Sequence, residues 1–160
     1  MSNATLASIR AKRLFRRVKC FRFCEAASDL PEWGAAIGKS VSETDEHLIG
    51  WQPNHSFADR FNPSLNGTRF LVLTDKAIYD VWENSFVRYG YSQMRGVAWD
   101  DEKGNLNMGT TLRIVNVDRK TSMLPVNFCD DSGASVFTIW RYLIGIITDN
   151  NRSSPNKNAP

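Results

Sequence analysis

Apolar and polar residues alternate along residues 68–99, and short polar turns interrupt the alternation. Successive side chains of a β-strand point to opposite faces, so this pattern predicts consecutive antiparallel strands joined by tight turns. The strands expected from this stretch are 69–73, 77–82, 86–91 and 96–99.

Three further segments extend the strand pattern on either side. Residues 47–51 form a short apolar run, and the segment 52–67 that follows contains two prolines and is expected to be a long loop. Residues 110–117 alternate clearly, and 122–128 give a last strand after another turn. Pro125 lies within this last strand and predicts a sheet edge or a bulge, because proline cannot donate a backbone hydrogen bond.

The period of the pattern changes near the C-terminus. Between residues 130 and 150, apolar side chains recur at helical spacing, and Asp130 and Asp131 are candidate N-caps. This segment is therefore predicted to be an amphipathic helix that covers a sheet or a barrel mouth. Its apolar stripe consists of Val136, Ile139, Trp140, Leu143, Ile144 and Ile147.

The N-terminal segment 5–25 contains neither glycine nor proline and is predicted to be a basic helix. Its apolar face is broad, although some Arg residues border it. Residues 26–45 are expected to be a linker with one short helical turn, in which Trp33 and Ile37 are packing anchors. The predicted organisation is an N-terminal helix and linker over 1–45, a folded domain over 46–150 and a disordered tail over 151–160.

Length and composition fit one globular domain with an extension. The chain has 160 residues, of which 42% are hydrophobic and 23% are charged, so it can bury a substantial core. No apolar stretch approaches the roughly 18 residues that span a bilayer, and no signal-peptide core is expected. These features predict a cytoplasmic location, in which Cys20, Cys24 and Cys129 would all be reduced.

The net charge of +3 conceals an asymmetry along the chain. Residues 1–25 hold seven basic residues against Glu25 alone, whereas the rest of the chain holds 13 basic and 16 acidic residues. A basic arm is therefore attached to a mildly acidic body. This asymmetry indicates either an anionic partner or an arm that docks on its own domain.

Three fragments in chain order resemble the bacterial PH-like and GRAM-like families. FLVLTDKAIYDV (70–81) is similar to their LTD/N-x-x-I-Y hairpin, RYGYSQMRGVAWD (88–100) to the strand pair that follows, and GTTLRIVNV (109–117) to their G-T-L-x-I strand. The resemblance covers about residues 46–150. It implies an α+β, mainly antiparallel fold, a PH-like barrel of about seven strands capped by a C-terminal amphipathic helix. The basic N-terminal helix lies outside the family pattern.

The basic arm is the main candidate site. Its cations could contact anionic lipid headgroups, each contributing on the order of 1 kcal/mol, with Leu14, Phe15, Val18 and Phe21 buried in the interface. The alternative is a helix packed on its own domain with its cations in solvent. The residues assigned to the anionic-surface site are Arg10, Lys12, Arg13, Arg16, Arg17, Lys19 and Arg22.

A further candidate is a loop site formed by Trp51 and His55 beside the Asn- and Pro-rich segment. The two histidines, His47 and His55, and the acidic cluster at 100–102 carry neither a catalytic motif nor metal-ligand spacing. We therefore expect no catalytic residue, no metal and no cofactor.

These features together predict a noncatalytic PH-like binding module that associates with anionic lipid surfaces, in the cytoplasm or peripheral to a membrane. One alternative is a protein–protein interaction or homo-oligomerising scaffold module that uses an exposed sheet edge. Another is an enzyme that uses His47 or His55. Nucleic acid is not expected as a partner, because a single basic helix without a recognised fold is insufficient.

Overall fold

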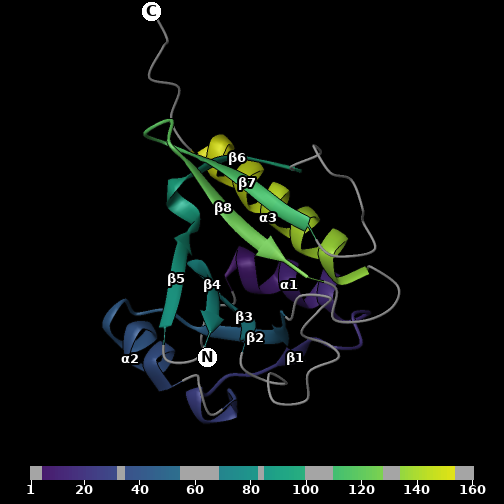
Figure 1. Cartoon of the computed structure of the whole chain (residues 1–160), viewed down its shortest axis with the longest axis vertical. Helices are drawn as coiled ribbons and strands as arrows, with labels where there is room; N and C mark the ends of the chain where they lie inside the picture. Colours follow the sequence, from purple (N-terminus) through teal and green to yellow (C-terminus); the bar gives the residue numbers. More distant parts are fainter. Residues whose placement is uncertain are drawn as a thin grey trace, which may run out of the picture.

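The computed structural model describes residues 5–31, 35–54, 69–82, 85–99, 110–127 and 134–153. Within these ranges, helices pack with eight strands that form two antiparallel sheets (Figure 1). The predicted α+β, mainly antiparallel class is therefore confirmed. The described strands of one sheet do not pair with those of the other, so the two sheets are not closed into a barrel.

The larger sheet is a five-stranded meander in which each strand pairs with the next along the chain. Four of its strands match the predicted strands to within two residues. The first strand was not predicted, because its two residues were assigned to a helix over 5–25. That prediction is wrong beyond Phe15, where the helix ends. The strands are β1 (Arg22–Phe23), β2 (Leu48–Pro53), β3 (Arg69–Thr74), β4 (Ala77–Trp82) and β5 (Ser85–Gly90).

The smaller sheet follows a short 3-10 helix, η5 (Tyr91–Gln93), and has the order β6-β7-β8. Pro125 lies in β8 at the edge of this sheet, which confirms the edge position predicted for it. The strands are β6 (Met94–Trp99), β7 (Thr110–Asn116) and β8 (Thr121–Val126).

Three α-helices and two 3-10 helices, η5 and η1 (Ala27–Asp29), accompany the sheets in the described ranges. The prediction of one short turn within 26–45 is wrong, since this segment contains a nine-residue helix. Ile37, one of the two predicted anchors, and Val41 are buried against the larger sheet, and this packing stabilises the helix. The other predicted anchor, Trp33, lies outside the described residues. The α-helices are α1 (Leu6–Phe15), α2 (Ala35–Glu43) and α3 (Ala134–Ser153).

The larger sheet has a hydrophobic core on each face. The main core contains side chains from both sheets, α1 and α3, whereas the second core lies against α2. The alternation predicted for β4 is confirmed, because Ile78 enters the main core while Ala77, Tyr79 and Val81 enter the second. Both faces of the larger sheet are thus covered by other elements.

The face that helix α3 presents to the core is the predicted one, except at Ile144. Val136, Ile139, Leu143 and Ile147 are buried as expected, but Ile144 is 36% exposed. Tyr142 is fully buried instead, in contact with Phe15 of α1. Because α1 packs along one flank of α3, the buried face of α3 is shifted toward that flank.

Of the two cysteines that the structure describes, Cys20 differs from the prediction. Cys20 is disulfide-bonded, so the expectation that all three cysteines are reduced is wrong. Cys24 is a free, buried thiol in the second core. Burial, with a smaller contribution from Asp29, raises the pKa of Cys24 to about 11.

Candidate functional site

The candidate site starts with α1, whose local sequence favours a helix. Thr5 is its N-cap, and its hydroxyl oxygen accepts a hydrogen bond of 3.2 Å from the backbone N–H of Ser8. The last turn carries Lys12 and Arg13, which also interact favourably with the negative end of the helix dipole. Part of the basic character of α1 therefore has a structural explanation.

The apolar face of the arm lies in the main core. Phe15 and Phe21 stack with their ring centroids 4.3 Å apart, and Phe15 also meets Tyr142 edge-on at 5.6 Å. Phe15, Val18 and Phe21 are each at most 5% exposed. The expectation that these side chains insert into a lipid interface is therefore wrong for this folded state.

The segment after α1 is also held in place by the rest of the fold. Arg22 and Phe23 form β1, which pairs with Trp51 and Gly50 of β2. A Cβ on Gly50 would overlap the ring of Phe21, so the glycine is needed for this close approach. The arm is thus an integral part of the fold, held at one end by α1 and at the other by β1.

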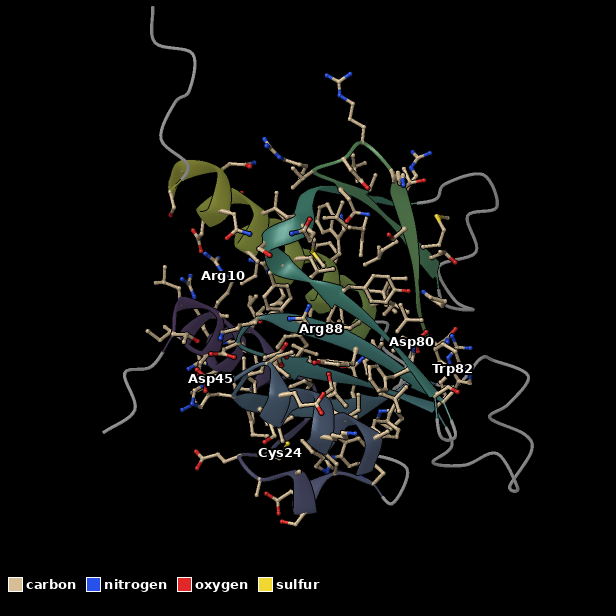
Figure 2. All side chains as sticks on the ribbon, turned by 90° about the vertical axis from the view of Figure 1, so that its left-hand side faces the viewer. Arg10, Cys24, Asp45, Asp80, Trp82 and Arg88 are labelled. Atoms are coloured by element: carbon tan, nitrogen blue, oxygen red, sulfur yellow. The ribbon has the colours of Figure 1, made fainter. Side chains whose placement is uncertain are left out.

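The seven basic residues of the arm fall into two groups. Arg10 is partly buried and pairs with Asp149 of α3 (Figure 2). The guanidinium of Arg22 donates to the backbone oxygens of Lys19 and Phe21, at 2.6 and 3.3 Å, and its side chain stays at the surface. The exposed group is Lys12, Arg13, Arg16, Arg17, Lys19 and Arg22.

The exposed cations of α1 and the following turn have no acidic partner among the residues that the structure describes. No carboxylate of the described residues forms an ion pair with Lys12, Arg13, Arg16, Arg17 or Lys19. The structure therefore confirms the packed alternative, in which the apolar side of the arm lies against its own domain and its cations face solvent. Contact of these cations with an anionic partner stays a prediction.

Of the two residues of the predicted loop site, the structure describes only Trp51. Trp51 is half-buried in β2 and packs edge-on against Phe70, with ring centroids 5.9 Å apart. His55 lies outside the described residues. Trp51 therefore has a packing role in the second core, and the structure does not test the pairing with His55.

His47 lies at the surface beside a carboxylate. Its Nδ1 is 3.3 Å from Oδ2 of Asp75, and its backbone N–H donates to Oδ1 of the same carboxylate at 2.8 Å. The side chain of His47 is 68% exposed, so this pair joins β2 to the β3–β4 turn at the protein surface. Within the described ranges, no group of three His, Cys, Asp or Glu residues could hold a metal ion.

A buried carboxylate network joins the chain before β2 to β3, β4 and β5. Glu46 accepts hydrogen bonds from Thr74 at 2.7 Å, from Tyr79 at 3.0 Å and from Nε of Arg88 at 2.8 Å. Burial acts to raise the pKa of Glu46, but these hydrogen bonds outweigh burial and lower it below its ordinary value. Tyr79 in turn lies 3.2 Å from Oγ of Ser40, which links α2 to the network.

A second polar network joins the two sheets. Asp80 is 2% exposed and accepts bonds from Arg69, at 2.7 and 3.2 Å, and from the side chain of Asn54 at 3.3 Å. Asn54 also donates to the backbone oxygen of Pro125 at 3.0 Å and accepts from the backbone N–H of Asn127 at 2.8 Å. These polar groups therefore have partners within the protein.

Figure 2 shows Asp80 and Trp82 close together, far from Arg10.

A cavity of about 410 Å³ lies among the start of α1, the β3–β4 turn and the C-terminal half of α3. Each of its charged groups already has a protein partner. Asp149 pairs with Arg10, and Arg88 pairs with Glu46. Lys76 donates to the backbone oxygen of Asp45 at 2.9 Å, and Asp75 bonds to His47. The charges that line the cavity therefore do not identify a ligand class.

Sequence reasoning missed the apolar side chains that α1 and α3 expose. On α1, Leu6 and Ile9 are 68% and 53% exposed, and on α3, Phe137 is 50% exposed. Phe137 and Ile144 lie on one face of α3, seven residues apart in the sequence. Their spacing was visible in the sequence, but it could not show which flank of α3 would be covered by α1.

Among the described helices, none is long and apolar enough to cross a lipid bilayer. His47, the buried networks and the charges of the cavity have the protein partners given above, whereas Arg16, Arg17 and Lys19 of the arm form no ion pair with a described residue. No protein-family model matches this chain, and no curated protein or solved structure is detectably similar to it.

Proposed function

We propose that this chain is a noncatalytic PH-like binding module that docks on anionic lipid surfaces through its basic N-terminal arm. The observation that carries the proposal is the set of exposed cations on an arm whose apolar face is buried in the main core. A folded arm presents these charges in a fixed arrangement, so binding does not require the arm to fold first. Each Lys or Arg near an anionic membrane contributes on the order of 1 kcal/mol.

Strand order supports the PH-like part of the proposal. A four-stranded meander, β2 to β5, precedes a three-stranded sheet, β6 to β8, and α3 follows both. This is the order expected from the sequence fragments that resemble PH-like domains. Side-chain bonds also hold β8 against the larger sheet, from Asn54 to Pro125 and from Tyr89 to the backbone oxygen of Met123.

Vesicle sedimentation of the full chain tests the lipid proposal. We expect binding to vesicles that contain phosphatidylserine, negligible binding to pure phosphatidylcholine vesicles, and weaker binding as the salt concentration rises. Equal and negligible binding to both kinds of vesicle at low salt would contradict the proposal. Tighter binding to a nucleic acid oligonucleotide than to anionic vesicles, measured by fluorescence anisotropy, would favour a different partner.

One observation favours a second candidate, an oligomerising scaffold. β5 lies at the edge of the larger sheet, is six residues long and carries Val87 with 41% exposure. An edge strand of this kind can accept a strand from another chain. Light scattering over a wide range of protein concentrations measures the molar mass in solution. A strict monomer at every concentration contradicts self-association.

A further inference from the structure

The solvent side of α3 combines apolar and basic side chains. Phe137, Arg141 and Ile144 follow one another at helical spacing and are all exposed. The guanidinium of Arg141 lies 5.9 Å from the ring centroid of Phe137, and the ring of Trp140 lies 5.5 Å from that of Phe137. An aromatic group beside a cation is typical of surfaces that contact lipid headgroups.

The other two sides of α3 are already occupied. Val136, Ile139 and Leu143 face the main core. Tyr142 contacts Phe15, and the guanidinium of Arg10 lies against Gly145, so this flank faces α1. The side that carries Phe137, Arg141 and Ile144 is thus turned away from both neighbours.

Helix α1 presents a matching side. Ala7, Ala11 and Phe15 face the main core, which leaves Leu6, Ile9, Arg13 and Arg16 on the opposite side. Leu6 and Ile9 are exposed apolar residues, and Arg13 lies four residues beyond Ile9. The outer side of α1 therefore has the same composition as the outer side of α3.

The two helices lie side by side and antiparallel. Arg10 meets Asp149 near the C-terminal end of α3, whereas Phe15 meets Tyr142 further toward its N-terminus. Figures 1 and 2 both show α1 next to α3. Both helices bury residues in the main core and contact each other directly, so their solvent-facing sides adjoin.

Charge separates this helical layer from the rest of the chain. Residues 5–22 and 134–153 together hold nine basic residues and one acidic residue, Asp149, which is paired with Arg10. The remaining residues hold 11 basic and 16 acidic residues. A cationic layer with exposed apolar groups, on an otherwise acidic chain, complements an anionic bilayer and favours one orientation on it.

We infer that α1 and α3 form a single membrane-contact face, on which Phe137 and Ile144 of α3 enter the headgroup region together with Leu6 and Ile9 of α1. Arg13 and Arg141 then lie at the level of the lipid phosphates. This inference rests on the proposed lipid-binding function and extends it, because it assigns part of the binding to a helix that begins more than 100 residues after the arm ends.

Vesicle binding by a pair of matched variants tests the inference. Phe137→Ser with Ile144→Ser removes two exposed apolar groups from α3, and Val87→Ser with Met123→Ser removes two of similar exposure from β5 and β8. With phosphatidylserine-containing vesicles, we expect the α3 variant to bind about tenfold more weakly or worse. The sheet variant is expected to bind like the wild type. Thermal melting confirms that each variant is folded.

Arg141→Glu provides an independent variant of α3 in case the apolar substitutions reduce folding. It is expected to weaken vesicle binding more than the same reversal at Arg113, an exposed residue of β7. If the wild type binds anionic vesicles but the α3 and sheet variants bind equally well, the inference is wrong and the proposed function stands. If the wild type does not bind them at all, the proposed function itself fails.

Discussion

The guanidinium of Arg10 in α1 pairs with the carboxylate of Asp149 in α3, across 139 residues of sequence. The same guanidinium occupies the space that a side chain at position 145 would fill, and Gly145 leaves this space open. One of the seven basic residues of the arm is therefore used to hold the two helices together. The remaining cations are the ones that can meet a partner.

Replacing Arg10 by alanine should destabilise the protein through loss of this pair. Because the side chains of Arg10 and Asp149 are 32% and 25% exposed, we expect a loss of about 1 kcal/mol in the free energy of unfolding. Lys12→Ala is the control, since Lys12 is exposed and forms no ion pair with a described residue. Urea unfolding measures both, and equal losses would contradict the role given to Arg10.

The depressed pKa of Glu46 predicts an acid-sensitive fold. A carboxylate whose pKa is lower in the folded than in the unfolded state stabilises the fold above its ordinary pKa of 4.5. This stabilisation is lost as the pH falls through the lower, folded pKa. Urea unfolding between about pH 6 and pH 3 should therefore show a falling free energy of unfolding in the wild type.

Glu46→Gln tests the origin of this acid sensitivity. We expect this variant to be less stable at neutral pH, because Arg88 loses its charged partner, and to lose less further stability on acidification. Asp45→Asn is the matched control, since the side chain of Asp45 is exposed and its left-handed backbone, with φ of 52°, tolerates asparagine. A Glu46→Gln variant as acid-sensitive as the wild type would rule out this explanation.

Removing the carboxylate of Asp80 should cost more than removing an exposed one. Asp80→Ala leaves Arg69 and Asn54 without their shared acceptor, and we expect a loss on the order of 3 kcal/mol. Glu43→Ala, which removes the exposed pair with Lys39, should cost less than about 1 kcal/mol. Thermal and urea unfolding compare the two, and similar costs would contradict the structural role of Asp80.

The two described cysteines should differ in reactivity. Cys24 is buried and its pKa is about 11, so iodoacetamide should label it slowly in the native protein and quickly in urea. Cys20 is disulfide-bonded and should become labelled only after reduction. Mass spectrometry of the labelled peptides measures the extent of labelling at Cys20 and at Cys24. Rapid native labelling of Cys24, or labelling of Cys20 in urea without a reductant, would contradict this assignment.

The sequence predicted the strands better than the position of the arm. Strands β3 and β4 were predictable because their alternating residues follow the pleat, and Pro125 was predictable at an edge because proline cannot donate. The helical period likewise predicted α3. These features depend on neighbours in sequence, which a single chain displays directly.

The remaining features depend on contacts between distant segments. Phe15, Val18 and Phe21 had the same amphipathic pattern whether they faced a bilayer or the main core, and the contact with Tyr142 decides for the core. The exposure of Ile144 follows from α1 occupying the neighbouring flank of α3. The candidate site was therefore predictable in its charges and not in its geometry.

Charge reversal on the basic arm is the most direct test of the proposed lipid binding. Arg13→Glu with Arg17→Glu changes two exposed cations of the arm, and Arg113→Glu with Lys120→Glu makes the same change in net charge on the smaller sheet. Binding to phosphatidylserine-containing vesicles should fall at least about tenfold for the arm variant, and less for the sheet variant. Equal affinities for the two variants would contradict the proposal that the arm is the site of contact.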